Sequence, residues 1–225
     1  RLCPGEIMST QTLLRTTLDA IHAGIAEGLH RGAQVVAWQG ERCVVDEAVG
    51  EAEPGRPMTH DVLMPWMSCT KAVTAVAVAQ QVEAGTLELD RPVADVLLDF
   101  GQNGKAGITL RHLLTHTGGF RLARYRFPGD PWNTILAHIH AAELERGWVP
   151  GQKAGYHLST SWFVLGELIR VVTGERFADY VKAEVLDPLG MTDCWIGMPH
   201  EVYDRQRDRF YLNLGNHPLT VRAST

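Results

Sequence analysis

The spacing of apolar residues predicts a helix at the start of the chain and a β-hairpin after it. From about residue 10 to residue 30, apolar residues recur at intervals of three and four, which places them on one stripe of a helix that Gly32 ends. The stripe consists of Leu14, Leu18, Ile21, Ile25 and Leu29. Segments 33–39 and 42–49 are rich in β-formers and join at Gly40, as in a hairpin. Because two strands alone are marginally stable in water, we expect this hairpin to pair with further strands.

The middle of the chain is predicted to be mostly helical. Segment 68–84 runs through alanine, valine, threonine and glutamine without a breaker and ends at Gly85. Its residues are apolar nearly all round, which predicts a helix buried inside the fold. Helical patterns follow at about 108–115, 131–146, 159–172 and 175–186.

Composition narrows the class of protein. The chain has 225 residues, of which 45% are hydrophobic, so it can build a sizeable core. A net charge of −5 argues against nucleic acid as a partner, because phosphate binding needs a concentrated basic face. We see no apolar run of the roughly 18 residues that spanning a membrane requires, and therefore expect no membrane partner.

The cysteine pattern bears on the compartment. The four cysteines form no close pair, and a chain of this size does not need disulfides for stability, so we expect reduced thiols. The first twenty residues lack the apolar core of a signal peptide. A cytoplasmic location is the resulting expectation. The chain opens on Arg1 and not on methionine, so a removed leader stays an alternative.

The start of the central helix carries candidate chemistry. Ser68 and Lys71 stand three residues apart, so their side chains share one helix face and can touch. A serine hydroxyl becomes a good nucleophile when a base takes its proton, and a desolvated lysine can be that base. The helix N-terminus adds free amide groups where negative charge would develop during acyl transfer. The alternative is a helix-capping serine beside a surface lysine.

The order of neighbouring motifs favours the chemical interpretation. Three blocks read WMSCTKAVTA at 66–75, LELDRPV at 87–93 and ITLRHLLTHTGG at 108–119. A fourth block runs from Pro150-Gly151 through Tyr156 to the segment DPLGM at 187–191. From about residue 33 to residue 200 the chain resembles the β-lactamase-related serine enzymes. That family includes class C β-lactamases, D-alanyl-D-alanine carboxypeptidases, family VIII esterases and some acyltransferases.

The resemblance implies a fold and roles for particular residues. The fold would be of the β-lactamase/transpeptidase-like α/β (α+β) class, with an antiparallel sheet flanked by helices and a mainly helical domain. Ser68 would form the acyl-enzyme, while Lys71 and Tyr156 would share the proton transfers, with either one as the general base. We expect Trp66, His116 and Leu158 to line the substrate pocket. Neither a cofactor nor a metal is expected.

Two departures from the family pattern refine the expectation. Lactamases and peptidases of this type carry Tyr-x-Asn, whereas Leu158 stands at the third position here. Loss of that amide favours an ester substrate or an acyltransferase over β-lactams and peptides. The family's third motif, a Lys/His-x-Gly or Trp-Gly-Gly strand that supplies an oxyanion-hole amide, is absent after residue 200. We therefore expect a complementary C-terminal portion or a second chain to complete the sheet.

Three rival interpretations remain. A metal site could use His112 with His116, or His138 with His140, but the glutamate of a zinc-hydrolase helix is missing. Cys69 could replace Ser68 as the nucleophile, although it lies one residue off the lysine face. A non-catalytic scaffold could keep the fold without the reaction.

The predicted organisation has three segments. Residues 1–60 would begin an α/β domain whose sheet is incomplete, 61–200 would form the helical domain, and 201–225 would lead toward the missing C-terminal portion. The active site would lie between the two domains. The predicted function is a serine hydrolase acting on a small-molecule ester or amide. The alternatives are an acyltransferase, a β-lactamase or D-Ala-D-Ala carboxypeptidase, and a scaffold.

Overall fold

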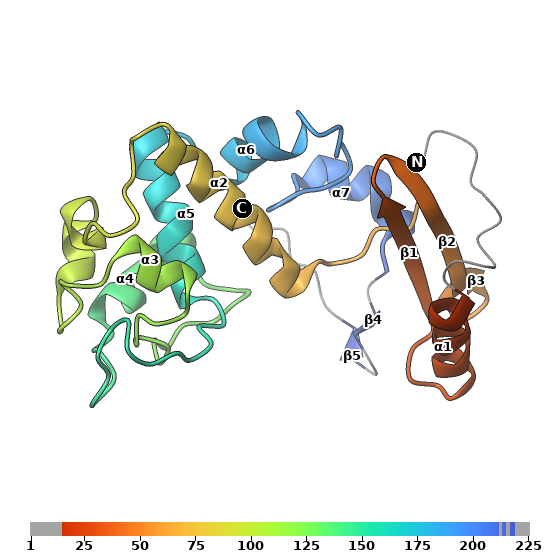
Figure 1. Cartoon of the computed structure of the whole chain (residues 1–225), viewed down its shortest axis with the longest axis horizontal. Coiled ribbons are helices and arrows are strands. Elements are labelled where there is room, and N and C mark those ends of the chain that lie inside the picture. The colour runs from red at the N-terminus through yellow and green to blue at the C-terminus, as the bar shows by residue number, and fades with distance from the viewer. Residues whose placement is uncertain (1–14, 212, 215–216, 219–225) are drawn as a thin grey trace. The chain divides into compact units, whose positions relative to one another are not determined.

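A computed structural model describes residues 15–211, 213–214 and 217–218 of the chain (Figure 1). The chain divides into two compact units. One comprises Arg1–Pro65 with His200–Val221, and the other comprises Trp66–Pro199 with Arg222–Thr225. We call them the sheet unit and the helical unit and describe each by itself.

The sheet unit contains the predicted helix and hairpin. Helix α1 spans Arg15–Ala26, and the rest of the predicted stripe before it lies outside the described residues. Strands β1 (Gly32–Gln39) and β2 (Arg42–Glu53) pair antiparallel from Gly32 opposite Gly50 to Gln39 opposite Arg42. The two-residue turn between them begins at Gly40, whose φ of 61° suits glycine in a tight hairpin. The hairpin is therefore confirmed, and its one further partner strand in the described sheet is short, β3 (Arg56–Pro57).

A distant segment of the chain completes the sheet unit. Helix α7 (His200–Gln206) leads through a 3-10 turn, Arg207–Arg209, to an isolated parallel bridge between Phe210 and Leu63. Arg56 donates hydrogen bonds to the carbonyls of Asp208 and Phe210 at 2.8 and 2.9 Å. Ala52, Met58 and Val62 form a small buried core in this unit. Strands β4 (Asn213–Leu214) and β5 (His217–Pro218) form a separate two-stranded pair.

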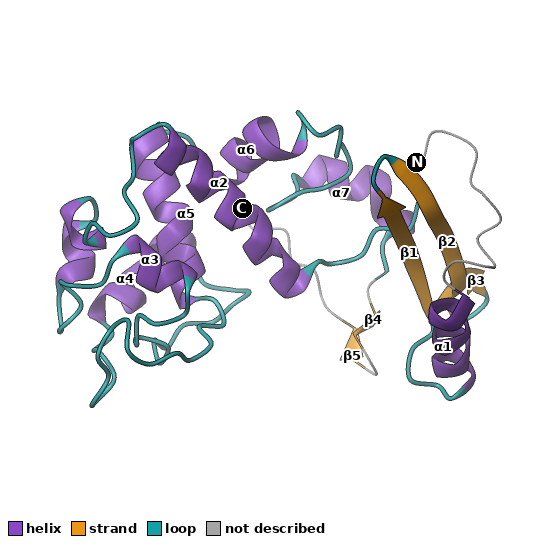
Figure 2. Cartoon of the chain, viewed as in Figure 1, coloured by secondary structure: helices purple, strands orange, loops and turns teal. Residues whose placement is uncertain are grey.

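The helical unit follows the predicted helices closely (Figure 2). Its regular elements are the 3-10 turn Met67–Cys69, α2 (Thr70–Glu83), the 3-10 turns Val93–Asp95 and Leu98–Gly101, α3 (Leu110–Leu114), α4 (Trp132–Ala141), α5 (Thr160–Thr173), α6 (Phe177–Val181) and the π-turn Lys182–Leu186. Helix α5 ends where Gly174 takes a φ of 78°, the left-handed conformation that stops helices. The predicted boundaries differ from these by a few residues because sequence periodicity does not mark helix ends.

The core of the helical unit is one continuous apolar cluster. Residues of α2, α3, α4, α5 and α6 contribute to it, together with Phe100 from the 3-10 turn Leu98–Gly101. Phe100, Leu113 and Ile169 have no exposed surface. Helix α2 buries one face through Ala77 and Val78, whereas Val76 is 48% exposed. The prediction that this helix is buried nearly all round is therefore wrong for the described chain. Alanine and valine made both faces look alike in the sequence.

Two further findings concern the thiols and the membrane. Cys43 is disulfide-bonded, whereas Cys69 and Cys194 are free, so the expectation of reduced thiols is wrong for Cys43. Sequence spacing does not show which cysteines a fold brings together. Within the described residues, no helix combines the length and apolar content that crossing a bilayer requires.

A candidate acyl-transfer site in the helical unit

Ser68 lies in the 3-10 turn Met67–Cys69 that leads directly into α2. Met67, the residue before it, has a φ of 48°, in the left-handed region that residues other than glycine seldom occupy. Strained backbone of this kind gathers at functional sites, where the surrounding structure holds it in place. Ser68 is consequently presented at an exposed turn, two residues before Thr70, where the 14-residue helix α2 begins.

Lys71 and Tyr156 meet at the hydroxyl of Ser68. The Lys71 amine donates to Ser68 Oγ at 3.2 Å, as expected for side chains three residues apart on one face. The Tyr156 hydroxyl lies 2.7 Å from the same oxygen, although 88 residues separate it from Ser68. The three predicted catalytic side chains therefore form one hydrogen-bonded chain. Their catalytic roles stay a prediction at this point.

The direction of the hydrogen bonds follows from the donors available. A lysine ammonium has donors only, so Ser68 Oγ accepts from Lys71. The hydrogen of Ser68 is then free to point at the oxygen of Tyr156. The hydrogen bond from Ser68, followed by that from Lys71 and its positive charge, lowers the pKa of Tyr156 below 10.0. These contacts therefore favour the ionised form of the Tyr156 hydroxyl.

Aromatic rings surround the Lys71 amine. Its Nζ lies 5.0 Å from the centre of the Tyr156 ring and 5.3 Å from that of Trp162 on α5. Both distances are within the range of a cation–π attraction. The half-buried lysine is thus held between the nucleophile and two aromatic faces.

His116 lies directly beside Tyr156. The centres of the two rings are 4.7 Å apart, and the ring planes are tilted by 34°. The backbone N–H of His157 donates to His116 Nδ1 at 3.0 Å. Burial, and after it the positive charge of Lys71, lowers the pKa of His116 below 6.5. His116 is therefore neutral near pH 7.

His157 anchors the loop that carries Tyr156. Its fully buried ring accepts from the backbone N–H groups of Gly119 and Phe120 at 3.0 and 3.4 Å. Its other nitrogen lies 2.7 Å from the carbonyl oxygen of Gly155, to which it donates in this tautomer. Burial lowers the pKa of His157 to about 4, so the ring stays neutral and keeps these partners.

The other predicted pocket residues are near the site along the chain. Trp66 is 44% exposed and Leu158 is 72% exposed, two residues from Ser68 and Tyr156 respectively. Their contact with substrate stays a prediction. Cys69, the rival nucleophile, is exposed, but the hydrogen bond of Lys71 reaches Ser68.

The histidines of the rival metal site have other contacts. His112 Nδ1 accepts from the Thr109 N–H in the capping box of α3, and His116 packs on Tyr156. His138 and His140 are in the last turn of α4. Among the described residues, no group of three or more histidine, cysteine or acidic side chains is arranged to hold a metal ion.

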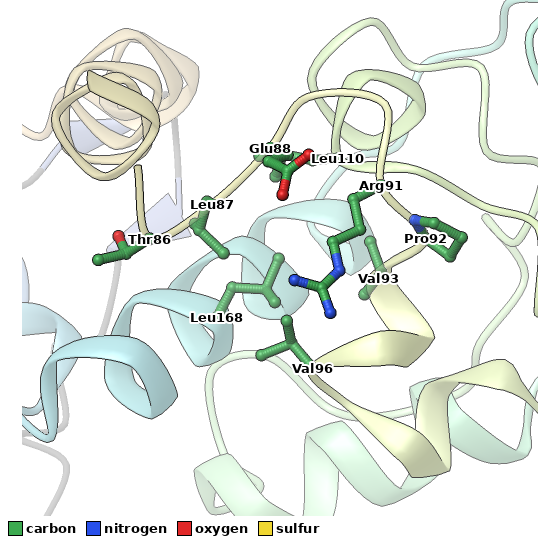
Figure 3. A pocket seen from close by; sticks show the side chains of 9 residues that line it. All are labelled: Thr86, Leu87, Glu88, Arg91, Pro92, Val93, Val96, Leu110 and Leu168. Atoms are coloured by element: carbon green, nitrogen blue, oxygen red, sulfur yellow. The ribbon is translucent and has the colours of Figure 1, made fainter. Parts of the chain in front are cut away.

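A small hollow lies elsewhere in the helical unit (Figure 3). Thr86, Arg91 and Leu168 are among its nine lining residues, which include none of Ser68, Lys71 and Tyr156. The hollow is therefore separate from the candidate site.

Sequence reasoning missed three contributors to the site. The sequence around Met67 gives no sign of its left-handed backbone. In the sequence, Trp162 is one apolar position among others on a helical stripe. His157 follows Tyr156 directly, which is the one signal that could have drawn attention to it.

Comparison with known proteins identifies the family. A family model described as Beta-lactamase matches residues 18–221. The chain belongs to the beta-lactamase family. Esterase EstB of Burkholderia gladioli is 32% identical over 168 residues, which cover 66% of this chain and 42% of that protein. Acyltransferase calJ of Penicillium decumbens is 37% identical over 108 residues, covering 41% of this chain and 24% of that protein.

A solved structure supports the same assignment of fold. The crystal structure of a family VIII carboxylesterase superimposes with a TM-score of 0.76 and 28% identity, covering 94% of this chain and 57% of that one. The predicted β-lactamase/transpeptidase-like α/β fold is therefore confirmed. The chain spans less than half the length of these curated relatives and little over half of the solved chain.

Proposed function

We propose that this beta-lactamase family member is a serine hydrolase that cleaves small-molecule esters through an acyl-enzyme on Ser68. The observation that carries the proposal is the hydrogen-bonded chain from Lys71 through Ser68 to Tyr156, with bonds of 3.2 and 2.7 Å. A nucleophile within hydrogen-bond reach of its base is the signature of covalent catalysis. The esterase names of related proteins support an ester as the substrate.

Acylation would begin with proton transfer from Ser68 to Tyr156. Ser68 Oγ attacks the ester carbonyl carbon while its proton moves to the ionised oxygen of Tyr156, and the carbonyl becomes a tetrahedral oxyanion. When the intermediate collapses, the bond to the alkoxide breaks and Tyr156 returns the proton to that leaving oxygen. Lys71 stabilises the tyrosinate through a hydrogen bond and through its positive charge, both of which lower the pKa of Tyr156.

Deacylation would use the same groups in reverse. Water attacks the acyl carbonyl, Tyr156 takes its proton, and Ser68 leaves with that proton while the carboxylic acid departs. In the proposed reaction, backbone amides at the start of α2 stabilise the oxyanion. That a further oxyanion-hole amide comes from a complementary portion or second chain stays a prediction.

The side chain at position 158 supports esters over amides. Leu158 is 72% exposed and has no group to pair with a substrate amide, whereas a polar side chain there could. A site without a matching polar partner leaves the substrate amide unpaired and so weakens its binding. We therefore place β-lactams and peptides behind esters as substrates.

Covalent labelling tests the nucleophile. A fluorophosphonate probe should label the wild-type protein on Ser68, as located by peptide mass spectrometry. Ser68→Ala should abolish the label, while Cys69→Ala, the matched control, should keep it. Equal labelling of wild type and Ser68→Ala would contradict the proposal, and loss of label only in Cys69→Ala would assign the rival nucleophile. Complete absence of labelling would favour the scaffold.

An acyltransferase is the second candidate. The similarity to acyltransferase calJ supports it, as does a Leu158 position suited to substrates without a side-chain amide. In such an enzyme an alcohol or amine, and not water, would attack the acyl-Ser68 carbonyl. Product analysis with a chromogenic ester and added alcohols or amines separates the two functions. Growth of transfer product at the expense of free acid would decide for transfer.

The cytoplasmic location stays a prediction, and one observation stands against it. Disulfides persist mainly in oxidising compartments, and Cys43 is disulfide-bonded. Fractionation of the native cells, followed by detection with an antibody against the protein, distinguishes a cytoplasmic location from an oxidising compartment.

A further inference from the structure

His116 contacts the chain on both sides of Tyr156. Its carbonyl oxygen accepts the N–H of Gly155 at 3.0 Å, and its ring Nδ1 accepts the N–H of His157 at 3.0 Å. Its ring packs against the Tyr156 ring with the centres 4.7 Å apart. One residue therefore holds the two neighbours of Tyr156 and the tyrosine ring itself.

The backbone of His116 is in an unusual conformation. Its φ of 60° lies in the left-handed region, which asparagine, aspartate and histidine enter more readily than most other residues. This conformation allows its carbonyl and its ring to serve the same loop at once. Strain of this kind persists where surrounding contacts impose it, and here those contacts are the bonds to residues 155 and 157.

The hydrogen bond at Nδ1 determines the protonation state of His116. A nitrogen that accepts a hydrogen bond carries no proton, so the neutral ring is the tautomer with its proton on Nε2. Protonation of Nδ1 would break the bond from the His157 N–H. It would also place a second positive charge near Lys71, whose charge already disfavours that state.

The second histidine makes the arrangement rigid. His157 stacks on His116 with the ring centres 5.9 Å apart and bonds to Gly155, Gly119 and Phe120. The loop after α3 is thereby tied to the loop that carries Tyr156 through two histidine rings.

We propose that His116 is a positioning residue for acyl transfer, which directs the Tyr156 hydroxyl at Ser68 by clamping residues 155 and 157 while its own ring remains neutral. The inference rests on the proposed function, because it assigns a role to Tyr156 in that reaction. The sequence-based expectation that His116 lines the substrate pocket stays a prediction. A residue that acts through Tyr156 should affect the rate of chemistry more than substrate binding.

Three groups that titrate or carry charge face His116. Lys71 faces it from α2, while Tyr156 and His157 face it from the loop before α5. Burial, and after it the Lys71 charge, lowers the pKa of His116, so the clamp of His116 on residues 155 and 157 should open only at a pH below the ordinary pKa of histidine. Because protonation of His116 opens the clamp, ester cleavage should become slower at acid pH.

The variants His116→Asn and His116→Phe separate the parts of the clamp. Asparagine tolerates the left-handed backbone and offers an oxygen where Nδ1 accepts, whereas phenylalanine keeps a ring and removes the acceptor. His138→Asn is the matched control, because His138 is exposed on α4. Each variant is measured for kcat and KM on a chromogenic ester from pH 5 to 9, with thermal unfolding as the check on folding.

We expect His116→Phe to lower kcat by about 10- to 100-fold with KM within about twofold, since small displacements of catalytic groups have effects of that size. His116→Asn should stay within about tenfold of wild type, and its acid-side loss of activity should move to lower pH. Wild-type kcat in folded His116→Phe would overturn the proposal, as would a change confined to KM. If His116→Phe does not fold, an unchanged acid limb in His116→Asn overturns it.

Titration of Tyr156 distinguishes this proposal from the proposed function. Ultraviolet difference titration against the same backgrounds carrying Tyr156→Phe reports the ionisation of this hydroxyl without requiring activity. The clamp predicts a higher pKa of Tyr156 in His116→Phe than in the wild type. If the wild type does not react with esters but the pKa of Tyr156 rises in His116→Phe, the proposed hydrolase function is refuted and the clamp is supported. An unshifted Tyr156 in a reactive protein refutes the clamp alone.

Discussion

Removal of one oxygen atom from Tyr156 is the sharpest test of the proposed reaction. Tyr156→Phe deletes the hydroxyl that lies 2.7 Å from Ser68 Oγ and leaves the ring in contact with His116 and Lys71. A positioned general base contributes about 10²- to 10⁴-fold to a rate. We therefore expect kcat/KM for ester cleavage to fall by that factor, or about 3–5 kcal/mol of activation free energy.

The stability of this variant should hardly change. Tyr156 is 52% exposed, and exposed positions away from special features usually alter the free energy of unfolding by less than about 0.5 kcal/mol. The matched control is Tyr125→Phe, which removes a half-buried hydroxyl 2.6 Å from Ser159 Oγ. This control should lose about 1 kcal/mol of unfolding free energy while keeping the wild-type labelling rate.

Stopped-flow labelling of Ser68 and steady-state ester hydrolysis measure the effect, and urea unfolding measures stability. Ionisation of Tyr156 should raise the wild-type rate with pH through a pKa below 10.0, and this rise should be missing in Tyr156→Phe. A Tyr156→Phe protein that reacts with the probe within threefold of wild type would refute a base role for Tyr156. The same loss of rate in Tyr125→Phe would show that the effect is not specific to the site.

Three further outcomes are expected. His157 has a pKa of about 4 when folded and an ordinary value near 6.5 when unfolded, so the unfolded state binds more protons between these values. The free energy of unfolding should therefore be full above pH 6.5 and fall by about 3 kcal/mol toward pH 4. Urea unfolding of His157→Gln should not show this loss. Lys105 is fully buried and donates hydrogen bonds to the carbonyls of Gln102, His140 and Ala142. Lys105→Met should lower the free energy of unfolding by about 2–3 kcal/mol, whereas the exposed control Lys153→Met should lower it by under about 0.5 kcal/mol. Equal losses in the two variants would refute a stabilising role of these bonds. Leu158→Asn should raise acylation by a chromogenic β-lactam about tenfold relative to an ester at unchanged stability, and an unchanged ratio of the two rates would argue that position 158 does not select the substrate.

Local pattern was enough to predict most of the secondary structure. A run without helix breakers located α2, helical patterns located α4 and α5, and the two β-rich segments around Gly40 located the hairpin, because these features depend on neighbours along the chain. The apolar content of α2 did not predict its burial correctly. Its two faces have nearly the same composition, and only packing against the rest of the unit distinguishes Val76 from Val78.

The sequence by itself determined the contact between Ser68 and Lys71, because a spacing of three residues on a helical turn brings the two side chains together in any fold. It also determined the family, through the order of motifs along the chain. Only the tertiary structure decided how Tyr156 reaches Ser68 across 88 residues. The loops concerned are tied together by His116, which has a left-handed backbone, and by the buried hydrogen bond to the His157 ring. These contacts join residues distant in sequence and follow no local period.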